Sequence, residues 1–267
     1  MRVLFPYNPL NEKEADGPFC DEYLFLREMG MECSLFDYDS LSFDEFRPKP
    51  RIGNGDVVLY RGWMLDPITY VKLSNLVERC GGQMLTDPDN FLKSHHLPGW
   101  YDSVAQFTPE TILVENEEEA VLRAEKTGWE KFFVKDFVKS NYSERGSIAY
   151  SPQEVLEIIA LIREHRGEIE GGIVLRKVEE FVSESEVRYF VFNGKPYSPN
   201  GFVPHLVAEI AKLHKAPFYS IDVVERTDGE LRLIEIGDGQ VSDRKNWDTD
   251  IFCKVLIEAD PLKIKNI

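Results

Sequence analysis

Two acidic residues, Asp222 and Glu235, lie within apolar segments of this 267-residue chain, on either side of an Asp-Gly step. The step Asp228-Gly229 favours a β-hairpin with a two-residue loop, and counting back along both strands from that loop sets Asp222 opposite Glu235. Like charges directly opposite each other destabilise a sheet unless something offsets them. Mg²⁺ would offset them, because it takes carboxylate oxygens as ligands; a solvated hairpin end or a β-bulge is the alternative.

The segment that follows the second acidic residue holds further groups that could contact a ligand. Two glycines flank Asp238, and glycine lets a backbone approach a bound molecule closely. Asp238 is therefore a candidate third metal ligand, with an ordinary turn as the alternative. We take Gln240 and Ser242, which come directly afterwards, as candidate substrate-binding residues.

Lysines occur inside apolar stretches of the middle of the chain. Lys135 lies within the apolar stretch 132–138, where a lysine either reaches out to solvent or meets an anion. Lys139 borders the polar loop 140–147, which could fold over phosphates although it holds a single glycine. Lys177 lies in a further apolar stretch. These lysines are candidates for binding an anionic ligand.

An acidic segment follows that stretch and leads into another strand. The segment contains Glu179, Glu180 and Val182, and the next strand opens with Glu186-Val187-Arg188. Alternation along a strand places Glu186 and Arg188 on one face. The pair is a candidate for a binding site, with a simple ion pair between the two side chains as the alternative.

The elements that must position these residues alternate between strand and helix patterns. Over the first hundred residues or so this alternation predicts a parallel, doubly wound sheet. After a connector from residue 94 to 108, strands are expected at 111–114, 132–138, 148–150 and 173–178, with helices at 116–126 and 151–166 between them. The last third is predicted to form one hairpin on Asn193-Gly194, a helix at 204–214 and the acidic hairpin.

Composition excludes several classes of function. The formal net charge is −16, so sequence-independent binding to nucleic acids or to anionic membranes is not expected. The N-terminus lacks a signal-peptide pattern, no apolar run is long enough to span a bilayer, and the cysteines are widely spaced, so we expect a cytoplasmic protein with reduced thiols. His95 and His96 are adjacent, and we expect loop or packing roles for them rather than metal binding.

Together these motifs resemble the ATP-grasp ligases over nearly the whole chain. Lys135 and Lys139 or Lys177 match the two lysines of that superfamily, and Glu179 with the acid seven positions later, Glu186, matches its hinge and ribose-binding acid. Asp222 and Glu235 match its metal carboxylates. Within the superfamily the chain looks most like the clade named for one arginine and two lysines, whose members occur in bacteria and phages.

The resemblance implies a fold and a division of the chain. The fold class would be α/β and α+β, with a pre-ATP-grasp Rossmann-like domain at 1–104 followed by two α+β ATP-grasp subdomains at 105–182 and 183–267. Residues 59–63, with Arg61 at the end of a strand, would belong to the first domain, and Arg61 is either a substrate contact or a surface arginine.

The resemblance also implies a function and its residues. The chain would be an ATP- and Mg-dependent, ADP-forming carboxylate–amine ligase that acts through an acylphosphate on small-molecule or peptide substrates. Lys135 would meet the α/β phosphates, and Arg188 would stabilise the transferring phosphoryl group or hold the acceptor carboxylate. Backbone groups around Glu180 and Val182 would read adenine, with Lys177 near the hinge. Lys139 is the further catalytic candidate.

Two features depart from the superfamily pattern. The usual Glu-x-Asn metal step reads Glu235-Ile236-Gly237, so Asp238 and Gln240 are both candidates for the third ligand, and the phosphate loop is poor in glycine. A small-molecule kinase on the same fold and a non-catalytic nucleotide-binding module are the alternative functions. The sequence leaves the substrates and the oligomeric state open.

Overall fold

The computed structural model describes residues 1–139 and 145–260. The chain divides into two compact units, and each is built from separate stretches of sequence. Unit 1 comprises residues 1–94, 187–221 and 237–267, and unit 2 comprises residues 95–186 and 222–236. The predicted boundaries at 104/105 and 182/183 stay a prediction.

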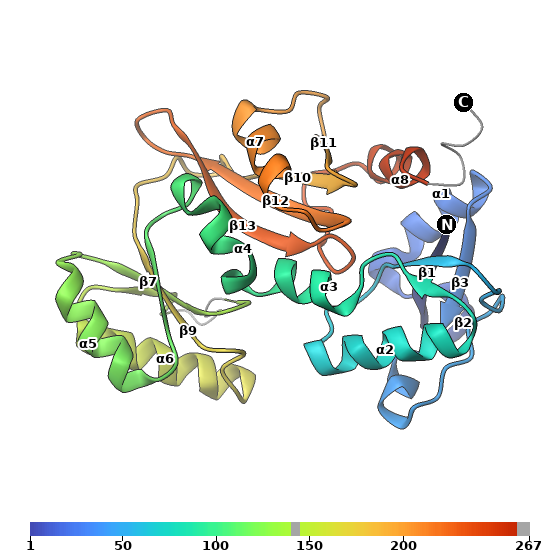
Figure 1. Cartoon of the computed structure of the whole chain (residues 1–267), viewed down its shortest axis with the longest axis horizontal. Helices are drawn as coiled ribbons and strands as arrows, with labels where there is room; N and C mark the ends of the chain where they lie inside the picture. The colour runs from blue at the N-terminus through green and yellow to red at the C-terminus, as the bar shows by residue number, and fades with distance from the viewer. Residues whose placement is uncertain (140–144, 261–267) are drawn as a thin grey trace. The chain divides into compact units, whose positions relative to one another are not determined.

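Strands and helices alternate through most of the chain (Figure 1). The strands are β1 Arg2–Asn8, β2 Asn11–Ala15, β3 Glu32–Phe36, β4 Val57–Tyr60, β5 Gln83–Met84, β6 Thr111–Val114, β7 Phe132–Asp136, β8 Ile148–Ala149, β9 Ile173–Lys177, β10 Val187–Phe192, β11 Lys195–Tyr197, β12 Phe218–Glu225 and β13 Leu231–Asp238. The α-helices are α1 Cys20–Glu28, α2 Pro67–Arg79, α3 Pro88–His95, α4 Leu97–Val104, α5 Glu117–Thr127, α6 Pro152–Arg166, α7 His205–Leu213 and α8 Thr249–Glu258.

The N-terminal sheet is mostly parallel, as the alternation of strand and helix patterns predicts. β1 pairs in parallel with both β3 and β4, and β4 pairs in parallel with β5, while β2 is antiparallel to β1. The central strands are almost entirely buried because helices and further chain cover both faces. Asp66 starts α2 by accepting hydrogen bonds from the amides of Ile68 and Thr69, which explains where that helix begins.

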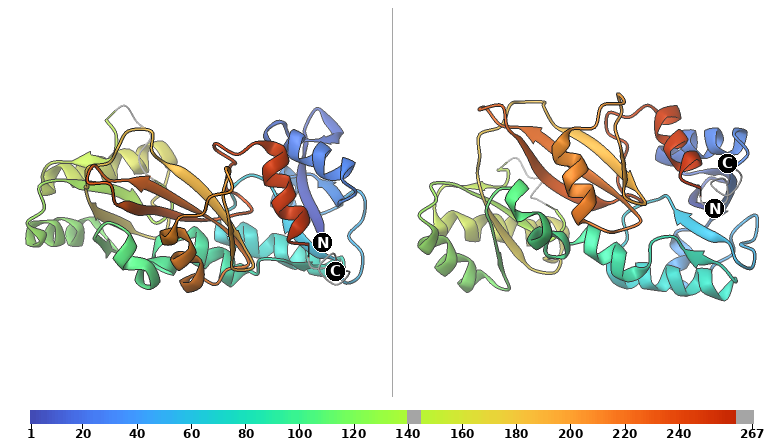
Figure 2. Two further views of the ribbon diagram at one scale, coloured as in Figure 1. Left: turned by 90° about the horizontal axis from the view of Figure 1, so that it is seen from above. Right: turned by 45° about the horizontal axis from the view of Figure 1, so that its top comes forward.

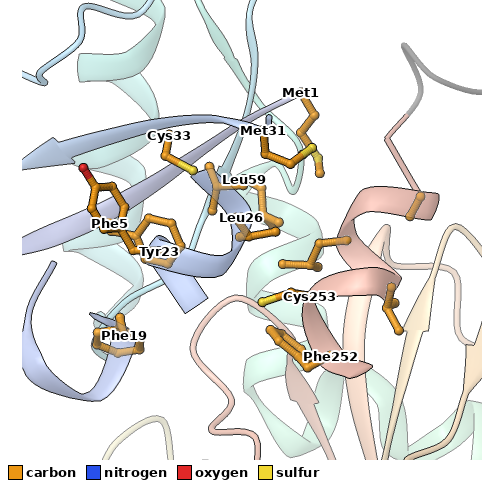
Figure 3. Close-up of a cluster of buried hydrophobic side chains, with 14 of the residues drawn as sticks. Met1, Phe5, Phe19, Tyr23, Leu26, Met31, Cys33, Leu59, Phe252 and Cys253 are labelled. Atoms are coloured by element: carbon orange, nitrogen blue, oxygen red, sulfur yellow. The ribbon is translucent and has the colours of Figure 1, made fainter. Parts of the chain in front are cut away.

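The C-terminal helix α8 completes the core of unit 1. It lies beside α1 in all views (Figures 1 and 2). Figure 3 shows Leu26 of α1 and Cys253 of α8 within one cluster of buried side chains, together with Phe5 and Leu59 from the sheet. Burying such side chains contributes roughly 1.5–3 kcal/mol each, so a segment late in the sequence stabilises the N-terminal fold.

Unit 2 is built on an antiparallel sheet with the strand order β6-β9-β7-β8. Helices α5 and α6 lie side by side on one face of it (Figure 1), where alternate residues of β7 and β9 such as Val134 and Leu175 form the core. Asn116 and Ser151 cap these two helices by accepting hydrogen bonds from the amides three residues later. The other face of the sheet is therefore free of these helices.

The third sheet has the order β11-β10-β12-β13 and contains both predicted hairpins. The predicted two-residue loop at Asn193-Gly194 is confirmed, since both residues have positive φ and Phe192 pairs with Lys195. The fold class inferred from the sequence, a mostly parallel N-terminal sheet followed by two α+β parts, is thus confirmed.

The prediction of a two-residue loop at Asp228-Gly229 is wrong. The Arg226 amide donates to Glu230 O (2.8 Å) and the Gly229 amide donates to Arg226 O (2.9 Å), which closes a loop of three residues, 227–229. Only Gly229 has positive φ there (+88°), whereas a two-residue loop of the expected kind needs positive φ at both central positions. An aspartate adopts that conformation less readily than the asparagine of the other hairpin.

The stretch from residue 94 to 108 is mainly helical and not an irregular connector. It contains the last two residues of α3 and the whole of α4. Pro98 lies in the first turn of α4, where a backbone amide has no partner within the helix, so proline is tolerated there. Among the helices of the described residues, none is long and apolar enough to cross a membrane.

Candidate functional site

An ion pair in unit 2 joins two of the predicted site residues. Lys135 Nζ of β7 lies 2.9 Å from Glu235 Oε1 of β13, although 100 positions separate them in the sequence. The lysine side chain is 7% exposed and the glutamate side chain 38%. The lysine therefore meets an anion and does not reach out to solvent, which decides between the two interpretations of its apolar strand.

Arg176 of β9 lies on the same face of the sheet as Lys135, and the sequence did not single it out. Arg176 pairs with Phe133, two residues before Lys135, so both basic side chains point away from α5 and α6. The Arg176 side chain is buried; its Nη1 donates to Ile234 O (2.7 Å) and its Nη2 has no hydrogen-bond partner among the described residues. Burial lowers the pKa of Arg176 to about 10, against the opposing effect of the Glu235 charge.

Asp222 is buried on β12, next to the strand that carries Glu235. The register at the far end of the hairpin, where the Gly239 amide donates to Phe218 O (3.2 Å), is the one the sequence predicts. At the loop end the register is displaced by one residue, because the loop has three residues. The extra residue must be accommodated between these two ends of the hairpin.

The burial pattern of β13 shows where the extra residue lies. Leu233 and Ile236 are both buried, whereas Ile234 and Glu235 between them are both half-buried, so the alternation changes phase there. We infer a β-bulge in which Ile234 and Glu235 together lie opposite Asp222. The burial pattern thus favours the bulge among the alternatives weighed for this hairpin, and the opposition of the Asp222 and Glu235 carboxylates stays a prediction.

Lys177 lies on the other face of β9, since it pairs with Phe132 of the helix-covered core. It lines a cleft of about 680 Å³ together with Glu179, Glu180 and Arg232. Glu179 forms a bidentate ion pair with Arg232 (2.9 and 2.8 Å), so both of its carboxylate oxygens have a partner. The predicted nucleotide-binding residues of unit 2 therefore divide between two places.

The backbone of the acidic segment pairs with the hairpin loop. The Val182 amide donates to Glu225 O (2.8 Å), and Glu180 O accepts from the Thr227 amide (3.1 Å). The one hydrogen of the Val182 amide is thereby committed, so reading adenine through it would require this bond to open. Glu186, the predicted ribose contact, is exposed.

In unit 1, Arg188 lies on β10 with its side chain buried. Its Nη1 donates to both Asp243 O and Asp243 Oδ1, each at 2.9 Å, and its own carbonyl accepts from Trp247 Nε1 (2.8 Å). Nearby loop residues thus hold the arginine in one position. Its predicted role toward the phosphoryl group or the acceptor stays a prediction.

Four other predicted residues of unit 1 belong to one buried polar network. Arg61 binds Glu22 through two hydrogen bonds (2.9 and 2.8 Å) and donates to three carbonyl groups, those of Gly239, Gln240 and Ser242. The Gln240 side chain donates to Tyr70 and Asp238 and accepts from the Tyr60 amide. The Ser242 hydroxyl donates to Asp238 O (2.8 Å). Arg61 is therefore a buried arginine and not a surface one.

Asp238 is fully enclosed in this network. Burial raises the pKa of Asp238 to about 7, although hydrogen bonds from Gln240 oppose the rise. Its Oδ2 has no hydrogen-bond partner among the described residues. Asp238 and Ile236 are both buried while Gly237 and Glu235 are half-buried, so alternation places Asp238 and Glu235 on opposite faces of β13. That placement argues against a shared ligand sphere.

Lys139 lies just beyond β7, with its side chain half-buried. Its amide donates to Asp136 Oδ1 (2.6 Å), and its carbonyl accepts from the Asp136 amide (3.0 Å), which forms a tight turn. Of the predicted phosphate loop 140–147, residues 140–144 lie outside the described residues.

A sequence model of a known protein family matches about half of the chain. Residues 126–256 match the sequence model of the family described as "ATP-grasp domain, R2K clade family 3". These residues form an ATP-grasp domain of the R2K clade. The resemblance inferred from Lys135, Glu179, Glu186, Asp222 and Glu235 is confirmed.

Solved structures of ATP-grasp ligases match nearly the whole chain. D-alanyl-alanine synthetase A from Vibrio cholerae is 12% identical, with a TM-score of 0.62, and the match covers 100% of this chain and 98% of that one. D-cycloserine synthetase DcsG is 15% identical, with a TM-score of 0.61 and coverage of 97% and 99%. The ATP-grasp ligase PsnB in complex with a minimal precursor is 13% identical, with a TM-score of 0.59 and coverage of 97% and 98%.

At these low sequence identities the matches establish the fold of this chain, but not its activity or substrates. PsnB has also been solved with a precursor, Mg and ADP, and with a precursor peptide and AMPPNP. No curated protein matches the sequence.

Proposed function

We propose that the protein is an ADP-forming carboxylate–amine ligase that uses ATP and Mg²⁺. The observation that carries the proposal is the 2.9 Å ion pair between Lys135 and Glu235, because it joins a predicted phosphate-binding residue to a predicted metal ligand. In this proposal residues 105–182 and 183–267 are the two ATP-grasp subdomains, and residues 1–104 are the pre-ATP-grasp domain.

The triphosphate is proposed to bind on the face of β7 and β9 that carries Lys135 and Arg176. Arg176 brings a buried guanidinium with an uncommitted Nη2, and phosphate oxygens are its natural acceptors. Lys135 would exchange its partner Glu235 for phosphate oxygens. Adenine and ribose would lie toward the hinge, near Glu180, Val182 and Glu186, and Lys177 would contribute from the hinge side.

Asp222 and Glu235 are the proposed holders of Mg²⁺. Their carboxylate oxygens suit this hard cation, and the inferred bulge sets both Glu235 and its neighbour opposite Asp222. When bound, Mg²⁺ neutralises charge on the β- and γ-phosphates. Asp238 fits less well, because it faces the other side of β13, and we assign its network with Arg61, Gln240 and Ser242 to positioning the segment 238–242.

The reaction follows from positioning and charge neutralisation. The acceptor carboxylate oxygen attacks the γ-phosphorus, the bond to the ADP oxygen breaks, and an acylphosphate forms. An amine then attacks the acyl carbon, phosphate leaves, and the nitrogen loses a proton to give the amide. Lys135 and Arg176 hold the phosphates, and Arg188 is proposed to bind the acceptor carboxylate or the transferring phosphoryl group.

Amino acids and peptides are the proposed substrate class. The structurally similar ligases include a D-alanyl-alanine synthetase and enzymes solved with precursor peptides. Their low identity to this chain leaves the individual carboxylate and amine to experiment.

The test is ADP release from ATP and Mg²⁺ by the full chain, screened against pooled amino acids and peptides, with mass spectrometry of the products. We expect ADP release that depends on an acceptor. The product should have the summed mass of the carboxylate and amine substrates less one water. A stable phosphoester would instead identify a small-molecule kinase. No ADP release with any acceptor, together with retained nucleotide binding, would identify a non-catalytic nucleotide-binding module.

A further inference from the structure

A second polar cluster in unit 2 lies apart from the proposed nucleotide site and involves both adjacent histidines. His96 Nε2 lies 3.0 Å from Glu170 Oε1, and His95 Nε2 lies 3.4 Å from the same oxygen. One ligand atom from each of the three residues lies within 4.8 Å of the others. His95 ends α3 and His96 precedes α4, so the chain turns between them and both rings reach one point.

The backbone holds the two sides of this cluster in place through Phe137. Phe137 O accepts from the Leu97 amide (3.0 Å), directly after the histidines, and the Phe137 amide donates to Glu170 O (3.2 Å). Gly171 and Gly172 lie so close to the Phe137 ring that a Cβ on either would clash with it (2.4 and 2.7 Å). The histidine segment and the Glu170 segment are thus fixed against one residue.

The second oxygen of Glu170 has its own partner. Arg166 Nη2 lies 3.4 Å from Glu170 Oε2, and Arg166 Nη1 forms an ion pair with Asp136, which also accepts from the Glu170 amide (3.3 Å). Arg166 is thereby neutralised by Asp136 and leaves Oε1 to the histidines.

The distances suit a tetrahedral ion. Zn–N and Zn–O bonds of about 2.0–2.1 Å at tetrahedral angles separate neighbouring ligand atoms by about 3.3–3.4 Å. The two Nε2–Oε1 separations, 3.0 and 3.4 Å, are close to that spacing. Two imidazoles and one carboxylate are borderline and hard donors of the kind that zinc takes.

We propose that His95, His96 and Glu170 bind one Zn²⁺ ion through His95 Nε2, His96 Nε2 and Glu170 Oε1, with water at the fourth position. Each imidazole then carries its proton on Nδ1. The ion would link His95 and His96, at the start of unit 2, to the loop between α6 and β9 that carries Glu170. This site is independent of the proposed ligase activity.

The test is calorimetric titration of the full chain, first freed of metal with a chelator, with Zn²⁺ in the presence of excess Mg²⁺. We expect one saturable site and a rise in melting temperature on zinc addition. His96→Gln and Glu170→Gln should each weaken zinc binding at least about tenfold and abolish the rise in melting temperature. Co²⁺ should give the visible absorption of a four-coordinate site in the unsubstituted chain but not in His96→Gln or Glu170→Gln.

Two controls separate this site from others. His205→Ala removes a histidine whose side chain is 89% exposed, and Glu235→Gln removes a proposed magnesium ligand; both should bind zinc as the unsubstituted chain does. Far-UV circular dichroism checks that each variant is folded. The absence of a saturable zinc site, or unchanged zinc affinity in folded His96→Gln and Glu170→Gln, would overturn the proposal.

Discussion

Lys135 and Asp136 are neighbours on β7, yet they face opposite sides of the sheet and serve different clusters. Lys135 lies with Glu235 and Arg176, on the face without α5 and α6. Asp136 is completely buried and accepts hydrogen bonds from Arg166 and from the Val138, Lys139 and Glu170 amides. One strand therefore supports two polar sites, because successive side chains point to opposite faces.

The two clusters differ in what they leave unsatisfied. Around Lys135, Arg176 Nη2 has no hydrogen-bond partner in the part of the chain that the structure describes, and the Glu235 carboxylate is 38% exposed, so an anion with its counter-cation can enter. In the second cluster, both carboxylate oxygens of Asp136 accept hydrogen bonds. Its unusual feature is that two imidazoles contact the same oxygen of Glu170. The first arrangement suits a nucleotide and the second suits a metal ion.

The largest expected effect is on the side of Lys135. Glu235→Gln removes a proposed magnesium ligand while keeping the size of the side chain, so ATP turnover should fall to background, as measured by ADP release. Glu230→Gln in the same hairpin is the matched control, since Glu230 is 70% exposed and pairs with Arg226 of the same hairpin. Turnover close to normal in Glu235→Gln would refute its role as a metal ligand.

On the side of Asp136 the expected effect is on stability. Asp136→Ala leaves Arg166 and several amides without their acceptor, and the free energy of unfolding should fall by about 3–5 kcal/mol in urea denaturation. Asp228→Ala breaks an exposed ion pair with Arg226 and should change that free energy by less than about 1 kcal/mol. Equal effects in the two variants would show that Asp136 has no special structural role.

His214 in unit 1 sharpens the comparison, because it is a buried histidine whose ring contacts a serine hydroxyl instead of a carboxylate. Burial lowers the pKa of His214 to about 4, and its Nε2 lies 2.9 Å from Ser94 Oγ. In the unfolded chain the His214 imidazole is protonated near pH 6.5, whereas in the folded chain it is protonated only near pH 4. Acidification from pH 6.5 to pH 4 therefore destabilises the fold. The loss should reach about 3 kcal/mol.

His214→Gln removes this titration and keeps a hydrogen-bonding group near Ser94. The difference in unfolding free energy between pH 7 and pH 4 should shrink by most of that amount, as measured by chemical denaturation at each pH. An unchanged pH dependence would mean that His214 titrates normally in the folded protein.

The smallest expected effect concerns nucleotide affinity. Lys135→Ala removes one charged hydrogen-bonding group and should weaken AMPPNP binding by about 1.5–3 kcal/mol in calorimetry with Mg²⁺ present. Lys126→Ala is the control, because Lys126 is exposed in the last turn of α5 and should leave the affinity unchanged. Equal losses in both variants would indicate a general charge effect rather than a phosphate contact.

Much of the fold could be predicted from local patterns. The strand 111–114 has the predicted bounds, and Asn193-Gly194 forms the predicted loop, because these signals lie within a few residues. The stretch 94–108 was predicted as a connector, yet α4 forms there with Leu97, Trp100 and Val104 buried, so packing decides its structure.

The site could be predicted less completely, because its geometry depends on register. Lys135 and Glu235 were singled out as residues in apolar strands, and the structure brings them together. Arg176 was not distinguished from Lys177, since only the pairing with β7 shows which one faces Lys135. The contact of His95 and His96 with Glu170 spans about 75 positions and carries no local signal.

The central claim is that Lys135 and Glu235 serve one nucleotide site. A double-mutant cycle tests it: AMPPNP affinity with Mg²⁺ is measured by calorimetry for the unsubstituted chain, Lys135→Ala, Glu235→Gln and the double variant. We expect both single variants to bind more weakly and the double variant to depart from additivity by at least about 0.5 kcal/mol. Strictly additive losses, or no AMPPNP binding by the unsubstituted chain, would contradict the account.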